Sequence, residues 1–439
     1  MVQVSIERRE NRFVQDLLSP SDRLLLNSTR DFVEEQVMPV RRELVESTRS
    51  DYKLVEEMQT KLLPLGLQGG FLPEEYGGMG LTSALTTALL AEEIGRGDAS
   101  LFGTLAGGLL AMRPAIAAGN RTVLEHFAPR LVQEDEVYLG CFAVTEPDSG
   151  SDIENPDLRG RIINTSAGLK NGEWSINGDK AWAVNAGLAG LYCIACSTDR
   201  SMGDEGIALI YAETPAEGFK SLACEDKAGM RGTRQAGFEL KGVRVPEAWR
   251  ASGSGEDARL LRDNQAFARI VTAGLAIGAA QGAFDEVLAF TTDRIAAGKP
   301  IRQHTVCASM LADIAIGIQV GRDTYANAAY MYDRPETYGE GSSTHMLSRA
   351  SSAKIYCCDA AIHATNRAME LMGSYGFVTD YYVEKYWRDA RTLQLWEGGA
   401  HLARLDVARG YYDYDQFHRN ELYELIRAVS YTHLRAHET

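Results

Sequence analysis

The segment 394–401, QLWEGGAH, holds one carboxylate, Glu397, between an aromatic ring and two glycines. Enclosure by apolar groups such as Trp396 makes a carboxylate a stronger base near neutral pH. Gly398 and Gly399 would let a ligand approach the backbone closely. A lone glutamate at a helix start more often complements the helix dipole. The segment therefore predicts either a general base or an ordinary helix-start residue.

The segment 141–152, CFAVTEPDSGSD, places a polar turn directly behind an apolar, strand-like run. Residues 147–150 favour a tight turn, and the hydroxyls of Thr145 and Ser151 flank it. Amides and hydroxyls at such a turn can bind an anion or the edge of a heteroaromatic ring. An ordinary polar loop is the alternative interpretation.

Trp182 lies in the strand-like run KAWAVNAG (180–187) next to a turn. It could stack on a flat cofactor, although a buried core role is commoner for tryptophan. The sequence contains no Walker loop, no GxGxxG between a strand and a helix, no HExxH and no GxSxG. Cys193 and Cys196 form CIAC without a second pair at metal spacing, so we interpret them as small buried hydrophobes. We expect no metal site.

Helices and strands must position these segments. The spacing of hydrophobic residues, which indicates helix or strand, changes twice along the chain. Helical spacing dominates residues 15–137, with Ser21 as a candidate cap. Short β-rich runs separated by Gly, Asn, Asp and Pro predict an antiparallel β domain over 138–250. Long helical patterns return over 256–428. The sequence therefore predicts an α+β protein with three domains.

Composition narrows the class of protein further. The chain has 439 residues and a formal net charge of -15, which disfavours a nucleic acid partner. We identify no signal peptide and no membrane span. Seven cysteines fit a reducing compartment, so we expect a cytoplasmic protein. Residues 429–439, VSYTHLRAHET, resemble the read-through of a sequencing adapter, and we expect this tail to be non-native.

Nine ordered runs resemble the acyl-CoA dehydrogenase family over nearly all of residues 15–425. These are LPEEYGGMGL, AVTEPDSGSD, INGDKAWAVNAG, EDKAGMRGT, VRVPE, ARIVTAGLAIGAAQGAFDEVLAFTTDR, LMGSYGF, YYVEKYWRDAR and WEGG. The resemblance implies an acyl-CoA dehydrogenase-like fold with an N-terminal helical domain, a middle antiparallel β domain and a C-terminal four-helix bundle. It also implies FAD between the β and helical parts.

The resemblance assigns Glu397 as the catalytic base, and Ala268 occupies the position of the base in a minority of the family. It implies that Arg294 pairs with the FAD pyrophosphate of another subunit. The implied cofactor-binding set is Phe142, Val144, Thr145, Ser151, Trp182, Val184, Arg294, Glu370, Gly373, Ser374 and Gly399. The implied substrate-binding set is Ser151, Arg269 and Gly398.

Five positions depart from the family pattern. Val184 replaces a Thr or Ser near flavin N5, and Glu370 replaces a Gln and would repel a pyrophosphate unless paired or re-aimed. The other departures are Ala297, Thr305 and Ser374. They identify a divergent member of the family.

The resemblance implies α,β-dehydrogenation of an acyl-CoA thioester, with Glu397 taking the α-proton and FAD N5 the β-hydride. It implies an electron-transfer flavoprotein as acceptor and a homodimer or homotetramer. Leu101 and Phe102 stand where glutaryl-type members carry an arginine, which disfavours a dicarboxylic acyl group. A row of small residues either widens the pocket floor for a branched or cyclic chain or packs helices tightly: Gly103, Thr104, Gly107 and Gly108.

Two other functions stay open at this point. One is an offshoot of the family that reacts with oxygen, or a lyase that uses the fold without net oxidation. The other is a non-catalytic relative that binds acyl-CoA. Flavin content and the rate of reoxidation in air would distinguish these functions from a dehydrogenase.

Overall fold

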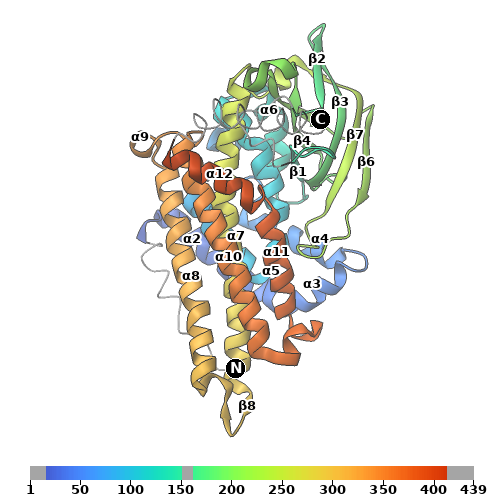
Figure 1. Cartoon of the computed structure of the whole chain (residues 1–439). Coiled ribbons are helices and arrows are strands. Elements are labelled where there is room, and N and C mark those ends of the chain that lie inside the picture. The colour runs from blue at the N-terminus through green and yellow to red at the C-terminus, as the bar shows by residue number, and fades with distance from the viewer. Residues whose placement is uncertain (1–15, 151–161, 413–439) are drawn as a thin grey trace, which may run out of the picture.

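The computed structural model describes residues 16–150 and 162–412. N-terminal helices, a sheet and a bundle of long helices follow one another along the chain, and helices α5 and α7 pack together at the centre (Figure 1). The predicted α+β class and the order helical, β, helical are confirmed. The expected non-native tail, 429–439, lies outside the described residues.

The longest of the N-terminal helices, α5, enters the core. The hydroxyl of Ser19, rather than the expected Ser21, caps the first helix by accepting a hydrogen bond from the Asp22 amide at 3.1 Å. The backbone of α5 leaves the helical region at Asp98, whose carboxylate accepts a hydrogen bond from the Ser100 amide at 2.7 Å. The helices are α2 (Pro20–Phe32), α3 (Arg41–Ser47), α4 (Lys53–Leu62), α5 (Ala84–Ala118) and α6 (Arg121–Leu131).

Seven strands of the described chain form one sheet in the order β1–β4–β2–β3–β7–β6, with β5 paired to β4. The expectation of an antiparallel domain is wrong at β4, because both β1 and β2 pair with it in parallel, with Gly140 opposite Leu191 and Ser166 opposite Ser197. Hydrophobic alternation sets which face a residue occupies but not which strand becomes its neighbour. The strands are β1 (Gly140–Ala143), β2 (Ser166–Lys170), β3 (Glu173–Val184), β4 (Leu191–Ser197), β5 (Ile207–Glu213), β6 (Phe219–Cys224) and β7 (Gln235–Pro246).

The C-terminal part is built on α7, which crosses α5 at very short range. A Cβ atom at Gly274 would lie 2.3 Å from the Ala88 carbonyl oxygen, and one at Gly278 would lie 2.2 Å from that of Glu92. The two backbones therefore touch, and no larger residue fits at either glycine. The elements are α7 (Glu256–Asp293), β8 (Ile295–Ala296), β9 (Lys299–Pro300), α8 (Thr305–Tyr332), α9 (Pro335–Tyr338), α10 (Thr344–Met372), α11 (Val383–Leu395) and α12 (Ala400–Tyr411).

Three of the described helices, α5, α7 and α8, are long and apolar enough to cross a membrane. The sequence analysis identifies no membrane span, although these three helices qualify by length and composition alone. The most apolar windows of α5 and α7 are 72% and 89% buried inside the protein, so the fold itself covers them. The corresponding window of α8 is 28% buried, which leaves an apolar face uncovered.

Glu146 fixes the turn after β1. Its carboxylate lies 2.9 Å from the Lys180 ammonium of β3 and accepts hydrogen bonds from the amides of Asn164 and Thr165 at 2.7 and 2.8 Å. Burial alone would raise the pKa of Glu146, but Lys180 and the Thr165 hydrogen bond together lower it below the usual value. The carboxylate is 2% exposed and is bonded to Lys180 and to backbone amides, so its role is structural.

We expect Glu146→Gln to reduce the free energy of unfolding by about 3–5 kcal/mol at pH 7, because it leaves Lys180 buried beside a neutral group. Since the folded pKa lies below 4.5, the carboxylate stabilises the fold above that pH and loses this contribution as the pH falls through the lowered pKa. The difference between wild type and variant should shrink towards pH 3. Denaturant titrations at pH 7, 5 and 3.5 measure it.

The matched control is Glu125→Gln, which breaks an exposed pair with Arg121 whose side chains are 60% and 81% exposed. We expect this control to change the free energy of unfolding by less than about 1 kcal/mol at every pH. A difference for Glu146→Gln that stays constant from pH 7 to 3.5 would show that its charge does not stabilise the fold.

Candidate active site

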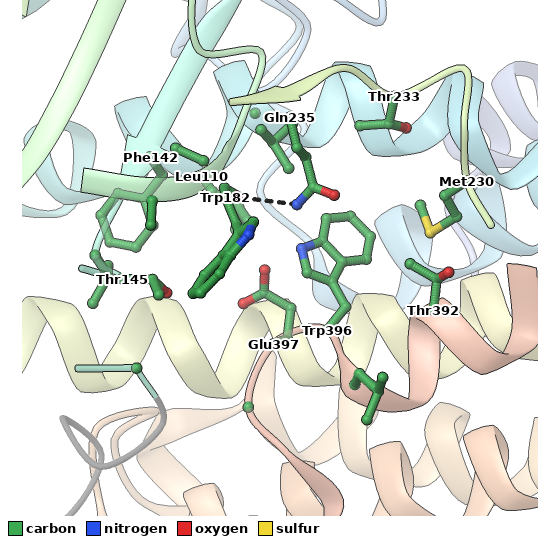
Figure 2. A pocket seen from close by; sticks show the side chains of 18 of the residues that line it. Leu110, Phe142, Thr145, Trp182, Met230, Thr233, Gln235, Thr392, Trp396 and Glu397 are labelled. Atoms are coloured by element: carbon green, nitrogen blue, oxygen red, sulfur yellow. Dashed lines mark hydrogen bonds between the residues drawn. The ribbon is translucent and has the colours of Figure 1, made fainter. Parts of the chain in front are cut away.

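A cavity of about 570 Å³ lies where the sheet meets the helices. Its walls come from the β1 strand and the turn after it, the end of β3, the loop before β7, and helices α5, α7 and α11 (Figure 2). The sequence therefore brings segments more than 200 residues apart to one site. The lining residues named in the sequence analysis are Phe142, Val144, Thr145, Trp182, Val184, Trp396, Glu397, Gly398 and Gly107.

Glu397 lies in the connection between α11 and α12, and its carboxylate points into the cavity. Figure 2 shows it between the indoles of Trp182 and Trp396. The backbone of Glu397 has φ +51°, in the left-handed region that non-glycine residues rarely occupy. Such a conformation costs about 1–3 kcal/mol and persists where the surroundings impose it. This geometry fits a base held in place better than an ordinary helix-start residue.

Two walls of the cavity suit a flat, aromatic cofactor. Trp182 is 54% exposed although it sits at the end of a strand, and its backbone has φ +50°. Phe142 and Val144 contribute further apolar surface, and Thr145 adds a hydroxyl beside them. An exposed indole over an apolar slot is what stacking on a ring such as isoalloxazine requires. The residues present therefore fit FAD.

A polar corner faces these apolar walls, and sequence reasoning did not identify it. Gln235 stands directly opposite Val184 in the β3–β7 pair, and its amide donates to the Trp182 carbonyl at 2.9 Å. The Lys227 ammonium donates to the Gln235 side-chain oxygen at 2.9 Å, and burial lowers the pKa of Lys227 to about 8. The run EDKAGMRGT, one of the nine that resemble the family, lies in this loop, but the sequence analysis gave Lys227 no role.

The other lining residues that sequence reasoning missed are Leu110, Met230, Thr233, Gln265, Thr392 and Leu395. They come from α5, α7, α11 and the loop before β7. A helical pattern shows that such residues lie on one face but not what that face meets.

Arg269, an expected substrate-binding residue, is 1% exposed and does not line the cavity. Its guanidinium donates to the Ser351 hydroxyl and the Asp406 carboxylate, both at 2.7 Å. Its Nε lies 3.5 Å from the Glu397 carbonyl oxygen. The structure therefore places Arg269 behind the Glu397 turn, where it contacts the backbone of the candidate base.

The residues expected to lie near the FAD pyrophosphate are at the end of the helix bundle where β8 is labelled (Figure 1). Arg294 closes α7 with its guanidinium 5.4 Å from the centre of the Tyr375 ring. Glu370 is paired with Arg367 at 2.7 Å, so the expected repulsive carboxylate has a partner. Gly373 and Ser374 are exposed beside it, Gly399 follows the cavity wall at Gly398, and Ser151 lies outside the described residues.

The small residues of α5 serve close packing. A Cβ atom at Gly107 would lie 2.4 Å from the Gly140 carbonyl oxygen and from the Asn185 amide nitrogen. One at Gly103 would lie 2.6 Å from the Thr233 hydroxyl. Of the two interpretations of these small residues, the structure favours packing for both glycines. Leu101 and Phe102 are buried in the core and do not line the cavity.

Comparisons with known proteins cover most of the described chain. Residues 19–135, 141–243 and 259–412 match the N-terminal, middle and C-terminal domain models of acyl-CoA dehydrogenase. Cyclohexane-1-carbonyl-CoA dehydrogenase of Syntrophus aciditrophicus is 30% identical over 384 residues, which cover 88% of this chain and 94% of that protein. Human mitochondrial short-chain specific acyl-CoA dehydrogenase is 29% identical over 392 residues, covering 89% and 90%.

Solved structures show the same fold. Butyryl-CoA dehydrogenase from Megasphaera elsdenii superposes with a TM-score of 0.80 at 27% identity, covering 90% of this chain and 98% of that one. A glutaryl-coenzyme A dehydrogenase bound to glutaryl-CoA gives a TM-score of 0.79 at 26% identity, covering 89% and 95%. The three matched domains show that the chain belongs to the acyl-CoA dehydrogenase family and is an FAD-dependent dehydrogenase.

Proposed function

We propose that the protein introduces an α,β double bond into an acyl-CoA thioester, with Glu397 as the base that accepts the α-proton. The observation that carries this proposal is the Glu397 carboxylate, which points into a largely apolar cavity between two indoles. An α-proton of a thioester is weakly acidic, so its removal needs a base in a site that excludes water. When bound, FAD supplies the acceptor for the hydride that leaves the β carbon.

In this proposal the backbone around Glu397 binds the thioester. An amide of the 397–398 turn donates to the thioester oxygen and stabilises the charge that develops there as the α-proton leaves. Trp182 and Phe142 hold the flavin ring, and Trp396 shields the base from solvent. Lys227 and Gln235 supply polar groups at the opposite wall.

The non-catalytic alternative is disfavoured, because a relative that merely bound acyl-CoA would need no strained glutamate facing the cavity. A specific observation keeps the oxidase alternative: buried Val184 lines the cavity where the family resemblance expects a hydroxyl. The rate at which the reduced enzyme reacts with oxygen distinguishes the oxidase from the dehydrogenase.

The substrate is, in our proposal, a short or cyclic monocarboxylic acyl-CoA. The names of similar proteins include cyclohexane-1-carbonyl-CoA and short-chain acyl groups. The flat face of Trp396 suits a compact acyl chain, and the flavin ring beside Trp182 must share the 570 Å³ cavity with that chain. Leu101 and Phe102 do not line the cavity, so they no longer disfavour a dicarboxylic acyl group. The basic residue of the described wall is Lys227, and its ammonium already donates to the Gln235 side-chain oxygen, which is why we keep the monocarboxylic assignment.

We further propose a cytoplasmic homo-oligomer that passes electrons to an electron-transfer flavoprotein. One solved structure, 27% identical with a TM-score of 0.79, comes from work on the electron transferring flavoprotein of Acidaminococcus fermentans and flavin-based electron bifurcation. The uncovered face of α8 supports the oligomer, because Val306, Ile316 and Val320 are 71%, 58% and 42% exposed. Apolar surface of this kind marks an interface.

We expect Glu397→Gln to keep its FAD and to lose reduction by substrate, with kcat lower by about 10²–10⁴-fold. Glutamine fills the same volume but cannot accept the α-proton. Anaerobic mixing with acyl-CoA, followed at the flavin absorption band, measures the loss. Glu125→Gln is the control and should reduce at the wild-type rate, whereas normal bleaching of the Glu397→Gln flavin would refute the assignment of the base.

A panel of butyryl-, octanoyl-, cyclohexane-1-carbonyl- and glutaryl-CoA tests the substrate class. We expect the first and third to bleach the flavin fastest, because the cavity is small and aromatic. Air admitted to the reduced enzyme should reoxidise it slowly. Faster bleaching by glutaryl-CoA would overturn the monocarboxylic assignment, and rapid peroxide formation would favour the oxidase.

Sedimentation velocity tests the oligomer. We expect the wild-type holoenzyme to sediment as a dimer or larger, and Ile316→Arg to shift it towards the monomer, because a buried unpaired charge at an interface is strongly unfavourable. Leu169→Arg, which introduces the same charge at an exposed apolar side chain of β2, away from α8, serves as the comparison and should not change the sedimentation. A monomeric wild-type holoenzyme would contradict the proposal.

A further inference from the structure

We propose that Lys354 of α10 is a positioning residue that holds the Glu397 turn in its productive orientation. Lys354 is fully buried, at 0% exposure. Its ammonium donates hydrogen bonds to the carbonyl oxygens of Gln394 at 2.9 Å and Gly398 at 2.6 Å. These two carbonyls bracket Glu397 along the chain. The inference rests on the proposed function, in which Glu397 is the base.

The segment that Lys354 holds is one that the chain does not stabilise by itself. Helix α11 ends at Leu395, so the carbonyl of Gln394 belongs to the last turn and has no partner within the helix. Trp396 is extended, and Glu397 and Gly398 then both adopt positive φ, at +51° and +88°. A buried cation satisfies the open carbonyl and complements the negative end of the α11 dipole.

Three residues on one face of α10 contact the segment around Glu397 or the arginine that bonds it. Ser351, Lys354 and Cys358 lie at spacings of three and four, which places them on the same face of the helix. Ser351 accepts the hydrogen bond of Arg269, whose Nε reaches the Glu397 carbonyl. Cys358 donates through its thiol to the Leu393 carbonyl at 3.5 Å. Among these three residues, Lys354 bonds carbonyl oxygens on both sides of Glu397 along the chain.

Fixing both carbonyls sets the direction of the Glu397 side chain. If the ammonium is removed, the peptides on either side of Glu397 can rotate, and the carboxylate no longer faces the cavity between the indoles. Misplacement of a reacting group by about 1 Å lowers rates by about 100-fold. Lys354 does not line the cavity, and the amide of the 397–398 turn acts on charge that develops only as the α-proton leaves, so the loss should fall on kcat rather than on binding of the acyl-CoA.

The test is Lys354→Met in the FAD-loaded enzyme. We expect kcat to fall by about 30–100-fold while KM stays within about threefold and FAD content is unchanged. An α-deuterated substrate should show a larger kinetic isotope effect on kcat than in the wild type, because proton removal becomes slower. Lys354→Gln, which keeps one donor group, should give an intermediate kcat.

The matched control is Thr365→Val, which removes another fully buried hydrogen bond from α10, the one to the Ala361 carbonyl at 2.8 Å. Its kcat and isotope effect should equal those of the wild type. If Lys354→Met does not fold, Lys354→Gln is judged by the same criteria, and failure of both to fold overturns positioning in favour of a purely structural role. A folded, loaded variant with wild-type kcat, or with a change in KM alone, also overturns it.

The assignment of Glu397 as the base and the positioning role of Lys354 can be refuted independently. If Glu397→Gln is reduced normally by substrate, the assignment of the base fails whatever Lys354 does. If Glu397→Gln is inactive and Lys354→Met has the wild-type kcat and isotope effect, the base assignment stands and the positioning role is refuted.

Discussion

Contact between backbones without intervening side chains, on two sides of α5, is the constraint on which the rest of this structure depends. On one side Gly274 and Gly278 of α7 lie against the carbonyls of Ala88 and Glu92. On the other side Gly107 meets β1, and the Asn185 amide donates to the carbonyls of Thr104 and Gly140, both at 2.9 Å. Helix bundle and sheet are thereby locked to one element, which fixes the distance across the cavity between them.

Such close contact brings charged side chains into the core, and the structure pairs them. Glu92 lies beside the Gly278 contact and bonds Arg322 of α8 at 2.6 Å and the Tyr325 hydroxyl. At the kink of α5, Asp98 lies 2.8 Å from the Lys385 ammonium of α11. The same α11 residue approaches Asp389, which accepts from the Met230 amide of the cavity loop at 2.6 Å. Electrostatic pairs therefore connect the α5 core to the helix that leads to Glu397.

A feature could be predicted from the sequence where it depends on neighbouring residues, and could not where it depends on contacts between segments far apart in the chain. The polarity of the Glu397 segment, the turn after β1 and the α+β order are local patterns, and the structure contains all three. The parallel β1–β4 pair, the Val184–Gln235 pair and the cation behind Glu397 are not local, because Lys354 and Gly398 meet through the packing of α10 on α11. A lysine within a helical pattern predicts a solvated face, and its burial follows from tertiary packing alone.

The positions of the expected cofactor residues also constrain the assembly. Phe142, Trp182 and Glu397 meet at one cavity, whereas Arg294 and Glu370 lie at the β8 end of the bundle. One FAD could not reach both groups within a single chain unless it ran the length of the bundle. If both groups bind the cofactor, Arg294 must serve the cavity of a second copy, and the uncovered apolar face of α8 gives such a copy a surface to pack on. In the proposed oligomer, the separation of the two groups of cofactor residues and the exposed face of α8 would have the same cause, because a neighbouring subunit would complete each active site.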